Sequence, residues 1–371
     1  MSGGPSKFFM QKFFKLDWVI LITIVLLLAI GFLALYSVSR GDSGTDLGNF
    51  KKQLISGAVG IIFMFTIAFF DYRSLSFFST KLYFLTLGVL FLVLFFGTTI
   101  RGTTGWIGLG AFHIQPVETA KLAMVIFLAS FFSQKKSQLS IVVRITASIV
   151  LIFFPVYLII RQPDFGSAMV IVVSWAVMLS ISGISRKNLL ILFLLGAIIS
   201  YSGWFVLRPY QKERLINFVN PYNDPRGSGY NVIQSMVAVG SGGLFGKGLG
   251  HGSQSQLNFL PEKHTDFIFA VIAEEMGFLG ATSVIFLLGL LLYRVKEVAR
   301  LAGDNFGYLL AVGILVMLFS QILVNIGMNI GVMPVAGVPL PFLSYGGSSL
   351  VAVFASIGIV QSIYLHKVKT L

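Results

Sequence analysis

The stretch VILITIVLLLAIGFLALYSV, residues 19–38, contains no charged residue. A helix rises about 1.5 Å per residue, so a segment of this length spans about 30 Å, the thickness of a bilayer's hydrocarbon core. The basic positions Lys7, Lys12 and Lys15 lead into it without a small-residue cleavage site, which favours an uncleaved first span over a signal peptide. This segment therefore predicts a transmembrane helix.

The whole chain has the composition that this first segment suggests. It is 56% hydrophobic and 11% charged over 371 residues, and its mean hydropathy of +0.88 is far above that of a soluble domain. We expect an all-α polytopic integral membrane protein, with about ten transmembrane helices in one domain spanning residues 1–371. The expected spans lie near residues 18–38, 52–70, 82–99, 117–133, 142–160, 167–183, 189–208, 267–293, 307–330 and 346–365.

The net charge of +13 is explained by topology rather than by nucleic acid. An even number of spans puts both termini on one side, and with the amino terminus inside most Lys and Arg residues fall in the segments on that side. We therefore expect cytoplasmic termini and no nucleic-acid partner. The chain has no cysteine, and its four histidines are scattered, so the sequence indicates no metal site.

One connection is much longer than the others. Residues 209–266, between the seventh and eighth spans, form an extracytoplasmic loop whose length is typical of functional loops. It contains the glycine-rich stretch SGGLFGKGLGHGSQ, residues 241–254, and the segment 229–244 predicts a short amphipathic helix that ends at glycine. We expect this loop to fold into a cap on the outer face.

Asp266 begins the eighth span, where a carboxylate can touch both water and the bundle interior. It suits a general base, or, with Thr265, a helix N-cap. Glu274 follows eight residues later, about 12 Å further along a continuous helix and hence inside the membrane. We interpret Glu274 and Glu275 as members of a buried hydrogen-bond network.

Two further motifs carry ionisable groups. In QPVETAK, residues 115–121, Glu118 and Lys121 are three positions apart and share a helix face, as a structural ion pair or as a pair that lines a site. In RQPDFGS, residues 161–167, Pro163 and Asp164 are a helix-start signal, and Asp164 is also a candidate site residue.

The segment NIGMNIGVMPVAGVPLPFLSYGGSS, residues 325–349, interrupts the last two spans. Its prolines, among them Pro341, prevent regular helix, and Gly346 and Gly347 allow close backbone approach. Irregular backbone at this depth lines a water-filled cavity or forms a tight buried turn.

The candidate charges share the outer side, which predicts a cleft for an anionic lipid headgroup beside a carboxylate. They are Arg101, Glu118, Asp164, Arg214, Lys247, Lys263 and Asp266.

The motifs resemble those of the SEDS family (shape, elongation, division and sporulation), most closely its elongation members. The resemblance covers nearly the whole chain, from QPVETAK through RQPDFGSA and the block at residues 229–277 to the segment at residues 325–349. It implies a peptidoglycan glycosyltransferase that polymerises lipid II at the outer face of the cytoplasmic membrane, with inversion and loss of undecaprenyl pyrophosphate.

The resemblance also implies roles for individual residues. Asp266 matches the family's essential acid, and would deprotonate the acceptor 4-hydroxyl. No cofactor is required, although Mg²⁺ or Mn²⁺ on the pyrophosphate is compatible with the scheme. The remaining expected substrate-binding residues are Arg101, Glu118, Lys121, Asp164, Arg214, Lys247, Lys263 and Ser344, with Glu274, Pro341, Gly346 and Gly347 as structural ones.

The family implies a class B penicillin-binding protein, a transpeptidase, as membrane partner. Two other functions stay open on the sequence. A lipid II flippase would depend on charges in the inner half of the bilayer, including Glu274 and Glu275, whereas a polymerase would depend on the outer rim and Asp266. A non-enzymatic scaffold of the cell-wall synthesis complex would need no base at all.

Overall fold

The computed structural model describes residues 12–41, 47–100, 102–110, 112–134, 140–185, 187–192, 218–225, 227 and 229–367, and single positions between 193 and 217. Nine long helices dominate this part of the chain. They are α2 (Trp18–Gly41), α3 (Gly48–Phe69), α4 (Arg73–Phe96), α5 (Pro116–Ser133), α6 (Ile141–Arg161), α7 (Phe165–Ile181), α12 (Ile268–Arg300), α13 (Asn305–Asn329) and α14 (Gly347–Leu365).

Eight of these described helices are long and apolar enough to cross a membrane, and α7, with 17 residues, is a shorter apolar helix. They correspond to nine of the expected spans, and the protein is a multi-pass membrane protein. The span expected at residues 189–208 lies mostly outside the described residues. The third expected span was misplaced, because α4 begins at Arg73 and ends before Gly97.

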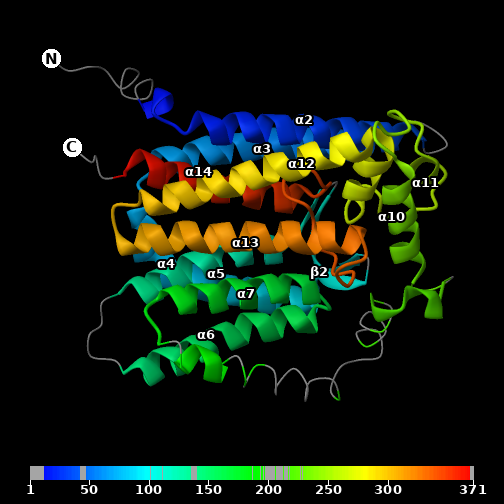
Figure 1. Ribbon diagram of the computed structural model, residues 1–371. Helices are drawn as coiled ribbons and strands as arrows, with labels where there is room; N and C mark the ends of the chain where they lie inside the picture. The colour runs from blue at the N-terminus through cyan, green and yellow to red at the C-terminus, as the bar shows by residue number, and fades with distance from the viewer. Residues whose placement is uncertain are drawn as a thin grey trace.

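The helices run side by side along one axis (Figure 1), with α13 packed between α12 on one side and α5 and α7 on the other. Most of α13 is buried, although Phe319 and Leu323 are exposed on one face, and its sequence is largely apolar. The start of α2 and the end of α14 lie side by side. The backbone amide of Asp17, just before α2, donates to the Gln361 side chain of α14. We call this the terminal end.

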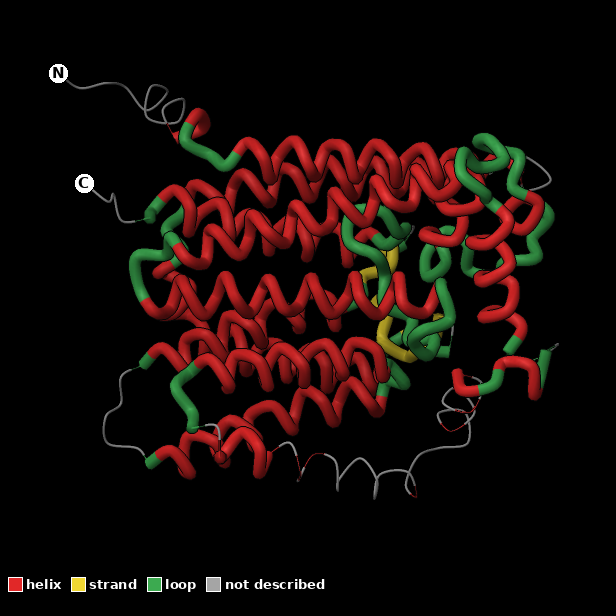
Figure 2. The backbone as a smooth tube through the Cα atoms, viewed as in Figure 1, coloured by secondary structure: helices red, strands yellow, loops and turns green. Residues whose placement is uncertain are grey.

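The opposite end, which we call the cap end, carries short elements (Figure 2). In the loop region these are the 3-10 helix η1 (Pro221–Asn223), α10 (Tyr230–Ser241) and α11 (Ser253–Gln256), and α10 ends at Gly242 as expected. The sequence did not predict the three antiparallel strands β1 (Thr98–Ile100), β2 (Thr103–Leu109) and β3 (Phe112–Ile114). β1 and β3 have three residues each, and Gly105 and Gly108 interrupt the pattern of β2, so none shows a clear alternation.

A break in α12 shapes the cap end. Gly277 has φ 68° and ψ −165°, a conformation essentially restricted to glycine, so Ile268–Met276 and the longer stretch from Phe278 onward are two helical segments. Groups left unpaired by the break bond to the glycine-rich loop: the Phe278 amide donates to the Gly243 carbonyl (2.8 Å), and the Lys247 amide donates to the Glu274 carbonyl (3.0 Å). The loop therefore completes the hydrogen bonding of the broken helix.

Glu274 bonds to the cap. Its carboxylate accepts from Lys247 Nζ (2.8 Å) and from the backbone amides of Gln254 (2.9 Å) and Ser255 (3.0 Å). Glu275 accepts from Ser37 Oγ (2.8 Å), near the cap end of α2. Both glutamates thus belong to a buried hydrogen-bond network, as expected, and this network lies at the cap end.

Gly277→Ala should lower stability, because a Cβ there would lie 2.2 Å from the backbone nitrogen of Gly246 and would occupy a strained conformation. Backbone strain of this kind costs about 1–3 kcal/mol, before any clash. The measurement is the thermal unfolding midpoint in detergent. Gly289→Ala is the control, since nothing lies within 4 Å of that position on the same helix, and it should leave the midpoint unchanged or raise it. Equal midpoints for the two variants would contradict the importance of the break.

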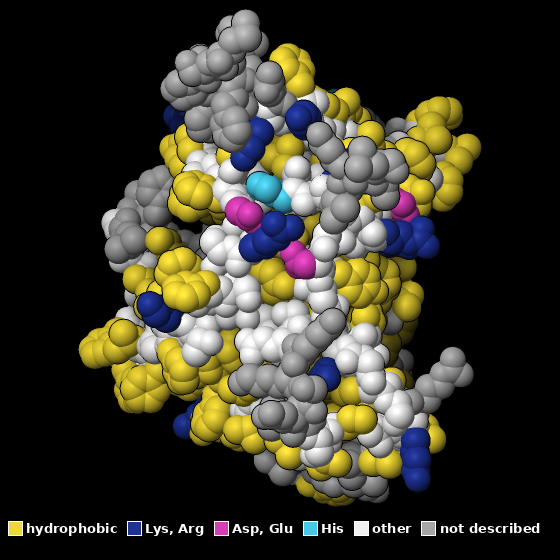
Figure 3. Space-filling view, turned by 90° about the vertical axis from the view of Figure 1, so that its left-hand side faces the viewer, with side chains coloured by type: hydrophobic (Ala, Val, Ile, Leu, Met, Phe, Trp, Pro, Cys, Tyr) yellow, Lys and Arg dark blue, Asp and Glu magenta, His cyan; other side chains and the backbone are white. Residues whose placement is uncertain are grey.

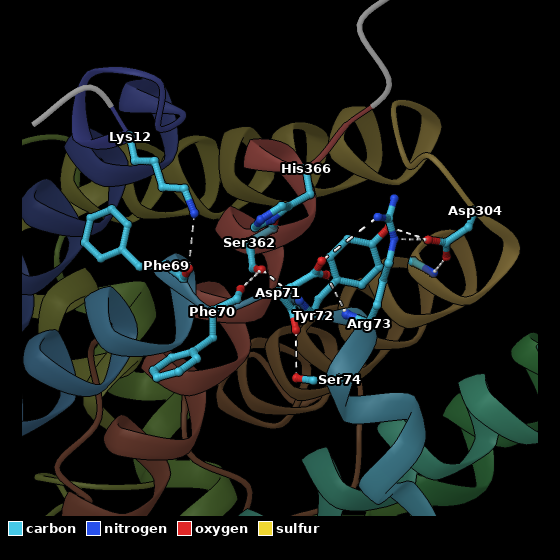
Figure 4. Close-up of polar contacts among 11 residues, drawn as sticks. Lys12, Phe69, Phe70, Asp71, Tyr72, Arg73, Ser74, Asp304, Ser362 and His366 are labelled. Atoms are coloured by element: carbon cyan, nitrogen blue, oxygen red, sulfur yellow. Dashed lines mark hydrogen bonds and ion pairs between the residues drawn. The ribbon is translucent and has the colours of Figure 1, made fainter. Parts of the chain in front are cut away.

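At the terminal end, Lys and Arg side chains surround a central group of acidic, basic and His side chains (Figure 3). Between the α3–α4 turn and the start of α13, Tyr72 Oη donates to Asp304 Oδ2 (2.6 Å), and Arg73 Nε donates to the same oxygen (3.0 Å) (Figure 4). Ser362 Oγ donates to the Phe70 carbonyl. The network ties the α3–α4 turn to the start of α13 and the end of α14.

The network sets the pKa of two of its members. Burial and the Asp304 carboxylate raise the pKa of Tyr72. Burial opposes ionisation of Asp304, but the Gly307 amide, the Tyr72 hydroxyl and the Arg73 guanidinium together lower its pKa. A carboxyl with a lowered folded-state pKa stabilises the fold above its unfolded pKa of about 3.9, and this contribution is lost as the pH falls further.

Tyr72→Phe should lower the free energy of unfolding by about 1.5–3 kcal/mol, because it removes a hydrogen bond to an ionised group. Tyr83→Phe is the matched control: it removes a bond to the neutral Leu151 carbonyl and should cost about 0.5–1.5 kcal/mol. Unfolding is followed between pH 7 and pH 3. The effect of Tyr72→Phe should shrink below about pH 4, while that of Tyr83→Phe should not; a pH-independent Tyr72→Phe effect would contradict this account.

Candidate active site

A cavity of about 130 Å³ lies at the cap end and includes Asp266 in its wall. Asp266 is half-buried and precedes α12, whose N-cap is Phe267 without a side-chain cap, so neither Asp266 nor Thr265 is the N-cap of that helix. A Cβ at Gly337, which has φ 66°, would lie 3.7 Å from Asp266 Oδ2. That distance is an ordinary van der Waals contact, so it is the positive φ that favours glycine at position 337 beside this carboxylate.

Three helices begin at the cavity wall. Gln115 precedes α5, Asp164 precedes α7, and Gly346 with Ser348 and Ser349 forms the start of α14. The backbone amide of Gln115 donates to Ser348 Oγ (2.9 Å), which joins the start of α5 to the start of α14. A helix start carries partial positive charge and free amides, so the three together favour negative charge in the cavity.

The irregular segment after α13 forms a second wall. Val335, Ala336, Gly337, Pro339 and Tyr345 line the cavity, as does Gly346. Lining a cavity was one of the two structures expected for this segment, the other being a tight buried turn. Gly166 allows the close fit, because a Cβ there would lie 2.3 Å from the Ala336 carbonyl oxygen. A Cβ added at Gly347 would lie 2.7 Å from Ser56 Oγ of α3, so this glycine allows a close approach. A Cβ added at Gly346 would meet nothing closer than 3.6 Å.

Asp164 lines the cavity and also caps α7, since its Oδ1 accepts from the Ser167 amide (2.9 Å). Burial raises the pKa of its carboxyl, although the Ser167 amide and the positive charge of Lys121 oppose this. Its two expected roles, helix cap and site residue, are therefore compatible.

Lys121 and Glu118 form an ion pair (Nζ to Oε1, 2.7 Å) whose side chains are 1% and 2% exposed. Neither is among the described residues that line the cavity, although the charge of Lys121 acts on Asp164. The geometry thus favours the structural reading of this pair. It lies behind the wall that carries Asp164.

Most of the other predicted site residues hold the cap together. Lys247 is paired with Glu274, and the buried Lys263 donates to the Ser255 carbonyl (2.9 Å) and to Asn258 Oδ1 (2.6 Å). Glu274 and Lys263 thereby bond to the two ends of α11. The structure gives Ser344 a structural role too, since it is buried and its hydroxyl bonds to the protein backbone.

Some expected residues cannot be placed, and others were missed. Arg101 and Arg214 lie outside the described residues, although the cavity-lining Ile100 and Thr103 flank Arg101 in sequence. Sequence reasoning missed Gln115, Trp106, Ser348 and Ser349. Gln115 and the serines stand in motifs that were already recognised, and their place at helix starts was the available signal. No group of three or more His, Asp or Glu in the described part of the chain could hold a metal ion.

The comparisons with known proteins agree with this architecture. The family model described as cell cycle protein, FtsW/RodA/SpoVE, matches residues 17–369. The chain belongs to the FtsW/RodA/SpoVE family. This is the SEDS family that the motifs resemble.

Individual members of the FtsW/RodA/SpoVE family match over almost their full length. The chain is 38% identical to the peptidoglycan glycosyltransferase MrdB of Escherichia coli K12, covering 99% of this chain and 98% of that one. It matches the crystal structure of RodA from Thermus thermophilus with 30% identity and a TM-score of 0.70, covering 94% and 96%. A structure described as a peptidoglycan synthase complex that coordinates polymerization and crosslinking matches with 34% identity and a TM-score of 0.79, covering 94% and 97%.

Lys121→Met should destabilise this family member by about 3–5 kcal/mol, because it leaves a buried Glu118 carboxylate without its counterion. The double variant Glu118→Gln/Lys121→Met removes both charges and should recover most of that loss. The thermal unfolding midpoint in detergent reports both. A double variant as unstable as Lys121→Met would contradict the paired-charge explanation.

Proposed function

We propose that the protein is a peptidoglycan glycosyltransferase that polymerises lipid II into glycan strands. The observation that carries this proposal is the half-buried Asp266 carboxylate in the wall of a cavity where three helices begin. The names of the relatives support the reaction class.

Asp266 is the general base in this proposal. Its carboxylate takes the proton of the acceptor sugar's 4-hydroxyl as that oxygen attacks the anomeric carbon of the lipid-linked donor. The bond from that carbon to the pyrophosphate oxygen breaks, and undecaprenyl pyrophosphate leaves with the electron pair. Attack from the opposite face inverts the anomeric centre. General-base catalysis of this kind contributes about 10²–10⁴-fold in rate.

The leaving pyrophosphate needs positive charge, and the described residues of the cavity wall include no Lys or Arg. The starts of α5, α7 and α14 offer partial positive charge instead. Arg101 stays a predicted contact, since its neighbours line the cavity. Mg²⁺ or Mn²⁺ is compatible with this scheme, with the pyrophosphate as its main ligand.

We assign the cavity to the reacting sugars, because it holds the Asp266 carboxylate, with the polyprenyl chains outside it in the bilayer. The excess of Lys and Arg at the terminal end supports cytoplasmic termini and an extracytoplasmic site. The likeness to the peptidoglycan synthase complex supports a class B penicillin-binding protein as the partner.

The flippase alternative loses its main support, because Glu274 and Glu275 bond to the cap and to α2 near the cap end, away from the terminal end. A scaffold would not depend on the Asp266 carboxylate. Dependence of polymerisation on that side chain therefore distinguishes an enzyme that uses Asp266 as its base from a scaffold.

Asp266→Asn should reduce lipid II polymerisation in liposomes at least about 100-fold, because an amide cannot accept the proton. The assay includes the transpeptidase partner with its crosslinking activity blocked by a covalent inhibitor. Asp71→Asn, an exposed carboxylate at the terminal end, is the matched control and should polymerise at the wild-type rate. Equal rates for wild type and Asp266→Asn would exclude Asp266 as the base, and lipid II transfer across the bilayer without polymerisation would favour the flippase.

A further inference from the structure

The backbone around Asp266 is held by other elements to an unusual degree. Three consecutive carbonyl oxygens accept hydrogen bonds from distant residues: His264 from the Tyr345 amide (2.8 Å), Thr265 from Ser344 Oγ (2.6 Å), and Asp266 from Asn325 Nδ2 (3.1 Å) and Asn329 Nδ2 (2.9 Å). Two donors satisfy both lone pairs of the Asp266 carbonyl.

Asn329 makes a specific replacement. In a regular helix the Ala270 amide would donate to the carbonyl of Asp266, four residues earlier. Here Asn329 Oδ1 accepts from the Ala270 amide (3.0 Å), and its Nδ2 donates to the Asp266 carbonyl. One side-chain amide thus stands between the two groups, so the helix begins after Asp266 and the carboxylate is directed by a turn instead of a helix.

The two asparagines are themselves fixed. Both are fully buried, at 0% exposure, and they stand four positions apart on one face of α13. Asn325 Nδ2 also donates to the Val338 carbonyl (2.8 Å) in the cavity-lining segment. Ser235 Oγ, from α10 of the cap, donates to the Asn329 carbonyl (2.8 Å). The turn at Asp266 is therefore joined to α13, to the irregular segment and to the cap.

Asparagine is required for this arrangement by its chemistry. Asn329 must donate to a carbonyl and accept from an amide through the two ends of one short planar group. An ionised aspartate has no donor, and leucine, with a similar volume, has neither function and would leave the Ala270 amide unpaired and the Asp266 carbonyl with one donor instead of two.

We infer that Asn329, with Asn325 and Ser344, is a positioning residue for Asp266. The inference rests on the proposed function, because it assigns these side chains the task of holding the base against the acceptor hydroxyl. None of the three lines the cavity among the described residues, so they act through Asp266 and not on the substrate. Displacing a catalytic group by about 1 Å costs about 100-fold in rate.

The test is the steady-state rate of lipid II polymerisation per folded molecule, with kcat and KM determined separately. Asn329→Leu should lower kcat about 10- to 100-fold while KM for lipid II stays near the wild-type value. Gln321→Leu is the matched control: it removes another buried amide from α13, two turns away and without a contact to Asp266, and should keep kcat near that of wild type.

Ser344→Ala covers the case in which Asn329→Leu fails to fold. It removes only the bond to the Thr265 carbonyl and the acceptor for the Leu340 amide, with little change in volume. It should lower kcat several-fold with KM unchanged, after normalisation to the folded, monodisperse fraction.

The outcomes separate the two proposals. If Asn329→Leu or Ser344→Ala loses thermal stability but keeps the wild-type kcat per folded molecule, while Asp266→Asn is inactive, the positioning role is wrong and the proposed function stands. A raised KM with unchanged kcat would also overturn the positioning role. If Asp266→Asn polymerises at the wild-type rate, Asp266 is not the base and the positioning role falls with it; if the wild type itself does not polymerise lipid II, the proposed function fails.

Discussion

The close approach of two backbones at Gly246 and Gly277 is the constraint on which the cap end depends. A Cβ added at Gly246 would lie 2.1 Å from the Glu275 carbonyl oxygen, and one added at Gly277 would lie 2.2 Å from the Gly246 nitrogen. Because the chain can pass so closely, α12 breaks, the glycine-rich loop bonds to the broken ends, and the segment Ile268–Met276 becomes a separate element that carries Asp266 at its start. The buried Glu274 and Lys263 then fix α11 over this junction. A base placed on a continuous membrane helix would have none of these supports.

On the other side of the cavity, irregular backbone is also held by hydrogen bonds to distant residues. α13 ends where Gly331 takes a positive φ of 75°, and the prolines beyond it prevent regular helix. The chain there gives its carbonyl and amide groups to Asn325, to Ser344 and to the turn at Asp266. Irregular backbone within a membrane protein must find partners inside the protein. The residues that form hydrogen bonds with this irregular backbone are also the ones that hold the turn carrying the Asp266 carboxylate.

Much of this was predictable from sequence. Apolar runs long enough to cross a bilayer gave the helices, because period and length are local properties. The motifs gave Asp266 and Asp164. The strands at residues 98–114 and the break at Gly277 were not predictable: a glycine inside an apolar helical run usually signals nothing more than a weak helix former, and only the distant Gly246 explains it. For the same reason Lys247, Lys263 and Ser344 were read as substrate contacts. Their partners, Glu274, Asn258 and Thr265, depend on a loop conformation that no local pattern encodes.

The cavity contains two carboxylates, and their surroundings separate their roles. Asp164 gives one oxygen to the first turn of α7, and burial raises the pKa of its carboxyl. Asp266 is half-buried, does not cap its helix, and is carried on a turn whose carbonyls are all anchored elsewhere. Environments that differ in this way push paired acids toward different tasks. Asp266, a partly exposed carboxylate on a rigid turn, suits a base. Asp164, a buried carboxylate at a helix start, suits a structural role in the facing wall of the cavity.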